Sequence, residues 1–182
     1  MEFDKPLAYR MRPRTLEEYV GQKHILGKDK ILYRTIKADR LSSIILFGPP
    51  GCGKTSLAKV ISETTKYKFE KLNAVTSGVS DIKKVIEDAK NLFLNPSGKC
   101  ILFIDEIHRF NKLQQDALLP FVEDGTVILI GATTENPYFE VNKALISRSM
   151  VFKLSPLTND NVFTILKNSI KNPDGLGNYN IL

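Results

Sequence analysis

The sequence predicts an α/β fold with a doubly wound parallel sheet, and three observations indicate it. Continuous apolar runs occur at 44–47, 100–104 and 127–130. Such runs are typical of strands that helices cover on both faces. Segments with the apolar spacing of helices separate these runs, and a glycine-rich loop follows the first of them. Strands that alternate with helices in this way predict a parallel sheet.

Besides the helix start behind the glycine-rich loop, local patterns in the first half of the chain predict two helices and one further strand. Pro6 and Pro13 keep the start irregular, and the first helix is predicted around residues 28–38. Apolar and charged residues alternate at 67–72, which predicts a strand. Ser80 is a candidate N-cap of the next helix. The predicted apolar face of that helix consists of Ile82, Val85, Ile86, Ala89 and Phe93.

In the second half, a break at 95–98 precedes the buried strand at 100–104. The helix over 113–122 is expected to bend or end near Pro120, because proline has no N–H for the helical ladder. A short linker at 123–126 then leads to the next buried strand.

The last strand is predicted at 150–153, and Pro156 marks a boundary behind it. An amphipathic helix over 161–167 precedes turn residues at 173–178. One helix cannot bury its own apolar face, so the chain is expected to enter a second structural unit here.

The composition is that of an ordinary globular protein, with 182 residues that are 42% hydrophobic and 25% charged. No apolar stretch approaches the ~18–20 residues of a membrane span, and the acidic, proline-broken start carries no signal segment. Cys52 and Cys100 are the only cysteines, which argues against a disulfide framework. The two cysteines and two histidines lack metal-ligand spacing. The net charge of +6 fits a nucleic-acid partner or a solvated lysine-rich surface equally well.

The most specific motif is the complete GxxxxGK[ST] loop at 48–55, between a buried strand and a helix start. Its glycines let the backbone turn N–H groups around phosphate oxygens, and the helix N-terminus adds partial positive charge. Lys54 can reach the β- and γ-phosphates, and the Thr55 hydroxyl can bind Mg²⁺. The loop therefore predicts binding of a nucleoside triphosphate. The predicted phosphate-binding set is Gly48, Pro49, Pro50, Gly51, Cys52, Gly53, Lys54, Thr55 and Ser56.

Two adjacent carboxylates, Asp105 and Glu106, follow the strand at 100–104. Open α/β sheets bind ligands at the carboxyl ends of their strands. There Asp105 would hold Mg²⁺, mostly through water, and Glu106 would activate the attacking water as a general base. An isolated acidic pair would be interpreted as the start of a solvated turn. Behind a phosphate loop about 50 residues upstream, the pair predicts hydrolysis.

Two further residues are candidates for catalysis. Thr134 follows the strand at 127–130, where its hydroxyl could orient the attacking water, although such a threonine can also satisfy its own backbone. Arg148 precedes the last strand and is either a surface charge or a finger that reaches a neighbour's γ-phosphate. Where arginine fingers have been dissected in GTPases, they contribute ~10³–10⁵ in rate. The finger interpretation implies a site that is completed only in an oligomer.

With these residues in place, the sequence resembles the AAA+ ATPases. It is most similar to the replication-associated recombination protein A family (RarA/MgsA), whose eukaryotic members interact with the Werner helicase. The resemblance covers roughly residues 5–170. Four stretches carry it: 6–13 with Val20-Gly21-Gln22; the loop at 48–55; 105–112 with 114–120; and 131–137.

The resemblance implies a P-loop NTPase fold of AAA+ type with a five-stranded parallel sheet, and the cofactors ATP and Mg²⁺. It implies a Walker A motif at 48–55, a Walker B motif at 101–106, sensor 1 at Thr134 and an arginine finger at Arg148. It also places five residues near the adenine: Arg12, Pro13, Val20, Gly21 and Gln22. The implied partners are DNA at stalled forks, ends or single-stranded regions, the single-stranded-DNA-binding protein, and further copies of the chain in a tetramer. The implied compartment is the bacterial cytoplasm and nucleoid, or the eukaryotic nucleus.

The resemblance also suggests a division of the chain. Residues 1–40 would form the N-terminal segment of the ATPase domain, 41–154 its nucleotide-binding core, and 155–182 the start of a helical lid. In the family the lid continues to a sensor 2 arginine and a C-terminal oligomerisation domain, so the chain is interpreted as an N-terminal fragment. The Holliday-junction branch-migration motor is a close relative, but it carries a long β-hairpin before the sensor 1 strand. The linker at 123–126 leaves no room for one.

Two functions fit these features. The first is an ATPase that couples hydrolysis to remodelling of replication-fork DNA, and the second is a clamp-loader-like, nucleotide-switched binding module with little turnover. Glu106 favours hydrolysis, because a pure binder needs no general base. Three residues keep open alternatives: His108 as a structural or functional histidine, Arg109 as a partner of DNA or of another subunit, and His24 beside the adenine or in a turn.

Overall fold

The sheet of this computed structural model has five strands, and the structure describes residues 5–91, 93, 95 and 97–178. The strands lie in the order β2-β3-β4-β1-β5, and every neighbouring pair is parallel. This confirms the doubly wound parallel sheet predicted from the sequence. The strands are β1 (Ile44–Phe47), β2 (Lys68–Asn73), β3 (Cys100–Asp105), β4 (Val127–Thr133) and β5 (Met150–Lys153).

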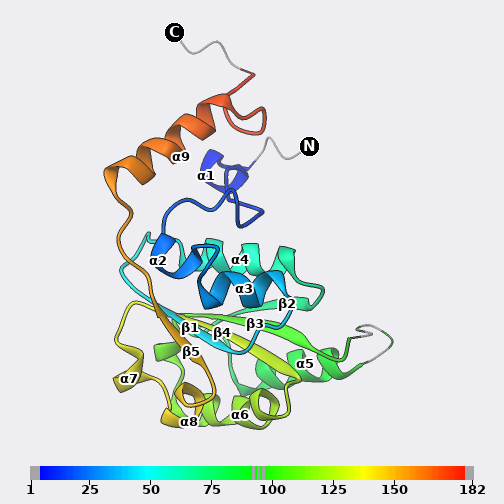
Figure 1. The fold of residues 1–182 in the computed structure, drawn as a ribbon. Helices are drawn as coiled ribbons and strands as arrows, with labels where there is room; N and C mark the ends of the chain where they lie inside the picture. Colours follow the sequence, from blue (N-terminus) through cyan, green and yellow to red (C-terminus); the bar gives the residue numbers. More distant parts are fainter. Residues whose placement is uncertain (1–4, 92, 94, 96, 179–182) are drawn as a thin grey trace.

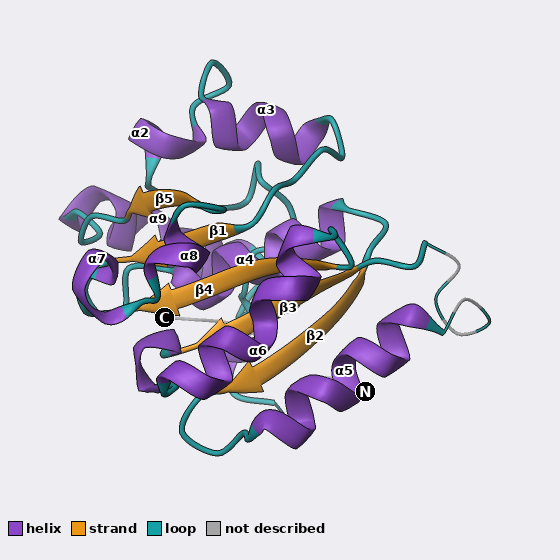
Figure 2. Cartoon of the chain, turned by 90° about the horizontal axis from the view of Figure 1, so that it is seen from below, coloured by secondary structure: helices purple, strands orange, loops and turns teal. Residues whose placement is uncertain are grey.

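Helices cover both faces of the sheet (Figure 1). Those of the N-terminal part and the helix after β1 lie on one face, and those between β2 and β5 lie on the other, as the view from below also shows (Figure 2). The elements of the first face are α2 (Lys23–Leu26), α3 (Ile31–Lys37) and α4 (Lys54–Thr64). The second face carries α5 (Val79–Lys90), the 3₁₀ turn η2 (Ile107–Arg109), α6 (Lys112–Glu123), α7 (Pro137–Glu140) and α8 (Lys143–Ile146). Beyond the first face lie α1 (Leu7–Arg10) and α9 (Asn159–Lys171).

Each face of the sheet has its own apolar core. Leu57 of α4 packs in the core that contains Phe103 of β3, whereas Ile82 of α5 belongs to the core that contains Leu102. Successive side chains of a strand point to opposite faces. A strand that serves both cores is therefore apolar at every position, and residues 100–104 are fully buried.

The order of the strands places β4 between β1, which leads into the glycine-rich loop, and β3, which leads into the acidic pair. Phe47 of β1 lies opposite Thr133 of β4, and Ile104 of β3 lies opposite Gly131. Because all strands are parallel, the loop after β1, the acids after β3 and the threonines of β4 reach the same edge of the sheet. The strand order therefore brings the segments of these three predicted motifs to one edge.

The helix after β2 differs from its prediction at both ends. Gly78 is its N-cap rather than Ser80, because the Asp81 carboxylate accepts a hydrogen bond from the Gly78 N–H at 2.7 Å. Phe93 does not belong to the apolar face, since the helix ends before it and its side chain is 93% exposed. The Asn91 side chain accepts from the Phe93 N–H at 3.1 Å and closes a turn instead.

Other predicted boundaries were wrong as well. The helix predicted around 28–38 begins only at Ile31, and the strand predicted at 127–130 continues to Thr133 because it keeps pairing with β1. The helix predicted over 113–122 is confirmed as α6, which runs to Glu123 and so does not end near Pro120. Proline removes one N–H from the ladder, and the Pro120 carbonyl still accepts from the N–H of Asp124 at 3.0 Å, so the next turn is intact.

The helix α9 begins earlier and ends later than the predicted 161–167. Thr158 caps it, and its side chain accepts from the Asn161 N–H at 3.2 Å. Its side chains Phe163, Leu166 and Ile170 are exposed. In Figure 1 the helix lies beside α1 and away from the sheet. The domain boundaries at 40 and 154 stay predictions.

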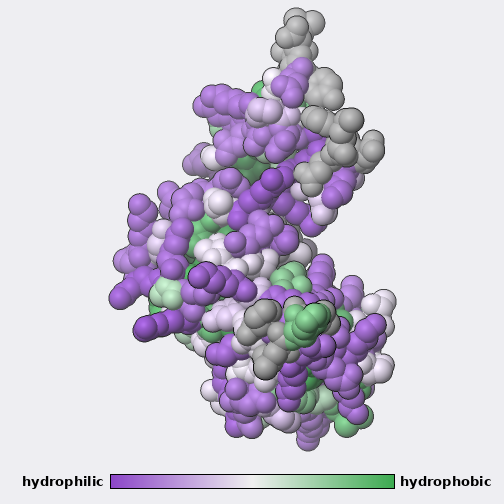
Figure 3. All heavy atoms as spheres, turned by 90° about the vertical axis from the view of Figure 1, so that its right-hand side faces the viewer, coloured by the Kyte–Doolittle hydropathy of each residue, from purple (hydrophilic) through white to green (hydrophobic). Residues whose placement is uncertain are grey.

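The face shown in Figure 3 is largely hydrophilic, with small, separated hydrophobic areas. None of the helices within the described ranges is both long and apolar enough to cross a membrane. Cys52 and Cys100 are free and buried, and burial raises the pKa of the Cys100 thiol to about 11. That thiol is therefore protonated at neutral pH.

Candidate functional site

The loop between β1 and α4 depends on its glycines. A Cβ on Gly48 would lie 2.4 Å from the backbone oxygen of Leu154, and a Cβ on Gly53 would lie 2.4 Å from the Tyr19 hydroxyl. Gly51 and Gly53 also have positive φ angles of 76° and 101°, a region that favours glycine. Such a loop before a helix presents backbone N–H groups to an anion.

Lys54 begins α4 and is almost fully buried. Its ammonium group donates hydrogen bonds to the carbonyls of Gly48 at 2.6 Å and Pro49 at 2.9 Å. A longer contact of 3.8 Å joins the ammonium to Sγ of Cys52. The charge is thus held against the loop by neutral acceptors, which phosphate oxygens can replace with stronger, charge-assisted bonds. Thr55 and Ser56 follow in the first turn of the same helix.

The acidic pair lies at the carboxyl end of β3. Asp105 is the last residue of that strand, and the Lys71 ammonium of neighbouring β2 lies 3.6 Å from its Oδ2 atom. Glu106 follows with a left-handed backbone, at φ 56°. Its side chain is 36% exposed, so this carboxylate is open to water.

The threonines at the end of β4 have different surroundings. Thr133 is completely buried, and its hydroxyl lies 2.8 Å from Nδ1 of His108. On the other side of that ring, Nε2 lies 3.4 Å from Oε2 of Glu106. Thr134, the residue predicted to orient water, is the next residue along the chain and is only partly buried. The structure therefore places both threonines at the edge that carries the acids.

Arg148 lies directly before β5 and is engaged within its own chain. Its guanidinium group is 2.6 Å from a carboxylate oxygen of Glu123, at the end of α6. It also donates to the carbonyl of Ala144 at 2.9 Å and to the Ser147 hydroxyl at 3.1 Å. Both ionic side chains are about half exposed, so a competing anion can reach this pair.

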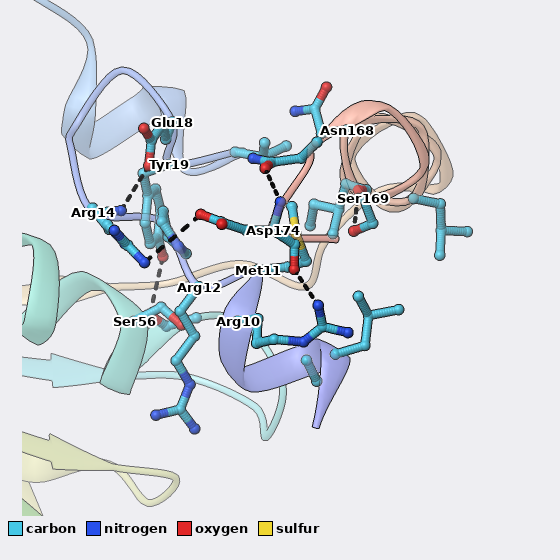
Figure 4. Close-up of a pocket in the computed structure, with 18 of the residues that line it drawn as sticks. Arg10, Met11, Arg12, Arg14, Glu18, Tyr19, Ser56, Asn168, Ser169 and Asp174 are labelled. Carbon is cyan, nitrogen blue, oxygen red and sulfur yellow. Dashed lines mark hydrogen bonds and ion pairs between the residues drawn. The ribbon is translucent and has the colours of Figure 1, made fainter. Parts of the chain in front are cut away.

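A cavity of about 790 Å³ opens beside the phosphate loop, between the N-terminal segment and α9. Figure 4 shows Arg10 and Arg14 directed at Asp174, which follows α9. Of the five residues predicted near the adenine, Arg12, Pro13 and Val20 line this cavity. Gly21 and Gln22 are not among its lining residues.

Gln22 instead connects three segments behind the cavity. It is 6% exposed, and its amide nitrogen donates to the carbonyls of Cys52 at 3.2 Å and Ser155 at 2.7 Å. Its amide oxygen accepts from the Ser155 N–H at 2.9 Å. Nearby, the Tyr19 hydroxyl donates to the Gly53 carbonyl at 3.2 Å, and burial raises the pKa of Tyr19. Both side chains thereby hold the phosphate loop against the N-terminal segment.

The donors at the sheet edge fit Mg²⁺. The Thr55 hydroxyl and the Asp105 carboxylate are hard oxygen ligands, and proteins bind Mg²⁺ through one or two such groups together with water and substrate phosphates. Across the described part of the chain, no three His, Cys, Asp or Glu residues converge into a cage for a metal. The chemistry of this edge therefore suits an ion that is shared with a nucleotide. The roles of the individual site residues stay predictions.

Sequence reasoning missed several residues that the fold brings to this region. Tyr19 and Glu123 contact the predicted site residues Gly53 and Arg148, and Thr133 contacts His108, for which the sequence left two interpretations open. No local pattern in the sequence signals any of these contacts. The partner of Arg148 is 25 positions away in the chain, and that of Tyr19 is 34 positions away. Only the packing of the elements creates these pairs.

The sheet order, the glycine-rich loop before α4 and the acids at the end of β3 define a P-loop nucleoside triphosphatase domain of the AAA+ class. The chain belongs to the family of the Holliday junction DNA helicase RuvB P-loop domain, which residues 11–151 match.

The relatives confirm the predicted resemblance. The chain is 53% identical over 173 residues to Replication-associated recombination protein A of Coxiella burnetii, covering 94% of this chain and 39% of that protein. It is 52% identical over 166 residues to ATPase WRNIP1 of Dictyostelium discoideum, covering 91% of this chain and 19% of that one. The chain thus spans about two fifths or less of these relatives.

A solved structure of the Thermotoga maritima RuvB Holliday junction branch migration motor has the same fold, with a TM-score of 0.73 and 27% identity. The match covers 89% of this chain and 54% of that one. In this chain only Asp124, Gly125 and Thr126 join α6 to β4, so the described residues contain no β-hairpin at that point. The shared P-loop domain and the absent hairpin agree with the resemblance predicted from the sequence.

Proposed function

We propose that this chain binds Mg²⁺–ATP and hydrolyses ATP, as the motor domain of a protein that acts on DNA during replication, recombination and repair. One observation carries the proposal: β4 lies between β1 and β3. This order brings the phosphate loop, the acids and the threonines to one edge of the sheet. The names of the relatives, which refer to replication-associated recombination, support DNA metabolism as the setting.

In this proposal each residue has a separate task. The backbone of 48–53 and the Lys54 ammonium bind the phosphates, and the cavity lined by Arg12, Pro13 and Val20 receives the nucleoside. Glu106 accepts a proton from the attacking water, and Thr134 holds that water through its hydroxyl. When bound by Thr55 and Asp105, Mg²⁺ would neutralise phosphate charge.

Glu106→Gln is expected to separate ATP binding from turnover. The amide keeps the size of the side chain but cannot accept the proton, so turnover should fall at least ~10²-fold, as for a lost general base. The ATP dissociation constant should stay within about twofold. Isothermal titration with ATP and a phosphate-release assay on the same preparation measure the two quantities. Unchanged turnover would sink the assignment of Glu106.

Hydrolysis between subunits is the second part of the proposal, with Arg148 reaching the γ-phosphate of a neighbour. Its exposure supports this role, since the guanidinium can exchange the Glu123 carboxylate for a phosphate. We expect Arg148→Ala to lower turnover by ~10³-fold or more if it acts as a finger. Mixing Arg148→Ala subunits with Lys54→Ala subunits should restore activity, because the second supplies the arginine and the first binds ATP. Failure of the mixture to exceed both separate proteins would count against action in trans.

DNA, the single-stranded-DNA-binding protein and assembly into a tetramer complete the proposal for the longer protein. The net charge of +6 is compatible with an electrostatic contact with DNA. DNA binding should therefore weaken as salt is raised, and binding that ignores salt would contradict the charge argument. Phosphate release with and without forked or gapped DNA tests whether DNA is coupled to turnover.

The Arg148–Glu123 ion pair supports a second candidate, a nucleotide-switched, clamp-loader-like module with little turnover. In a single chain the finger is held away from any neighbour. This candidate predicts tight ATP binding and negligible phosphate release, whether or not DNA is added.

A further inference from the structure

The ring of His108 lies between the proposed general base and the end of β4. Its Nδ1 atom is 2.8 Å from the Thr133 hydroxyl, and its Nε2 atom is 3.4 Å from Oε2 of Glu106. The ring is only 11% exposed, and Thr133 is completely buried. We call these three side chains the Thr133–His108–Glu106 bridge. It connects the strand that carries Thr134 to the carboxylate that would activate water.

The partners favour one position of the hydrogen in the neutral ring. An ionised carboxylate only accepts hydrogen bonds, so a neutral ring that donates to Glu106 carries its hydrogen on Nε2, the atom that faces the carboxylate. Nδ1 is then an acceptor, and the Thr133 hydroxyl donates to it at 2.8 Å rather than to the Glu135 carbonyl, which lies farther away at 3.5 Å. That hydroxyl also accepts from the N–H of Glu135 at 3.0 Å. The bridge therefore has one direction, from the Glu135 backbone through Thr133 and His108 to Glu106.

A backbone hydrogen bond and close packing against β4 hold the turn that carries His108. Glu106 has the left-handed conformation, and its carbonyl accepts from the Arg109 N–H at 2.8 Å to start η2. Ile107 is fully buried. A Cβ on Gly131 of β4 would lie 3.0 Å from the Ile107 side chain. The turn is thus anchored to β4 at both Ile107 and His108, which limits the movement of the ring.

We propose that His108 is a positioning residue, which with Thr133 holds the Glu106 carboxylate at the water that it deprotonates. This inference rests on the proposed ATPase function. The 3.4 Å separation exceeds that of an ordinary hydrogen bond, and contacts of catalytic groups commonly tighten when substrate binds. A purely structural histidine would need only Thr133, whereas this ring also faces the carboxylate.

Nitrogen NMR of the ring tests the bridge without any turnover. The chain has two histidines, and His24→Asn identifies the signals of His108. We expect the Nε2–H form of the neutral ring. Thr133→Val should shift the Nδ1 signal, and Glu106→Gln should shift the Nε2 signal. A mixture of both ring forms that neither substitution changes would overturn the bridge.

Kinetics test the positioning role. His108→Asn retains an acceptor near Thr133 but does not reach Glu106, whereas His108→Gln can still donate to the carboxylate. We expect His108→Asn to lower kcat by about 10- to 100-fold, as for a misplaced catalytic group, with the ATP dissociation constant within about twofold. His108→Gln should recover part of the loss. In the Glu106→Gln background, His108→Asn should cause no further loss.

Thr133→Val should also lower kcat, and the double variant with His108→Asn should be no slower than His108→Asn alone. Thr64→Val is the matched control, because Thr64 lies at the far end of α4 from the phosphate loop and its hydroxyl donates to the Val60 carbonyl of the same helix. Thermal unfolding and ATP affinity identify any variant that fails to fold.

Equal kcat for His108→Asn and the unsubstituted chain would overturn the positioning role. An unsubstituted chain that binds ATP without turnover would overturn the proposed function instead, while the NMR result stands by itself.

Discussion

Gly48→Ala is expected to remove most ATP binding and to destabilise the fold by about 3 kcal/mol. The added Cβ would lie 2.4 Å from the backbone oxygen of Leu154, and no side-chain rotation can relieve that clash. Either the phosphate loop or the end of β5 must move. A displaced loop no longer aims its N–H groups at phosphate, so ATP affinity should fall about a hundredfold, equivalent to roughly 3 kcal/mol.

Gly125→Ala provides the control for this prediction. Gly125 has a positive φ of 76°, but a Cβ there would meet no atom within 4 Å. Its substitution should therefore cost only the backbone strain of about 1 kcal/mol, with ATP affinity unchanged. Urea unfolding and isothermal titration with ATP measure both effects. Equal loss of stability in the two variants would show that the Leu154 contact is not what requires glycine at position 48.

Gln22→Ala is expected to weaken both the fold and ATP binding, although Gln22 does not line the cavity. The substitution removes the hydrogen bonds from the Gln22 amide to the Cys52 carbonyl of the loop and to the Ser155 carbonyl. The carbonyl of Cys52 would lose a buried partner, which costs about 2 kcal/mol together with the other lost bonds. ATP affinity should fall because the loop loses its support on that side.

Two further variants make this prediction specific. Gln22→Glu keeps an acceptor for the Ser155 N–H but turns a carboxylate oxygen towards two carbonyls, so it should be at least as damaging as Gln22→Ala. Gln114→Ala removes a comparable tie on the other face of the sheet, where the amide donates to the Ser77 carbonyl at 2.9 Å. It should lower stability and spare ATP affinity. If both Gln22 variants bound ATP normally, Gln22 would be a structural residue only.

Local patterns in the sequence were sufficient for the sheet and for the motifs. The run at 100–104 predicted a strand buried on both faces because it serves two cores. The loop at 48–55 was recognisable because phosphate binding depends on backbone shape, which glycine spacing encodes. Helix ends were less predictable. Ser80 misled because the Asp81 carboxylate accepts from the Gly78 N–H and makes Gly78 the cap. Pro120 does not end α6, because one missing N–H does not stop a packed helix.

By itself, the sequence determined the P-loop class of the domain, the strands of its sheet and the position of the acidic pair behind a strand, since each depends on neighbours along the chain. Only the tertiary structure decided which side chains meet across the sheet edge. It set Gln22 behind the loop, Glu123 against Arg148, and His108 between Thr133 and Glu106. The physical reason is that these contacts join residues on different strands and helices. Their distances depend on how the layers pack, and no local pattern records that packing.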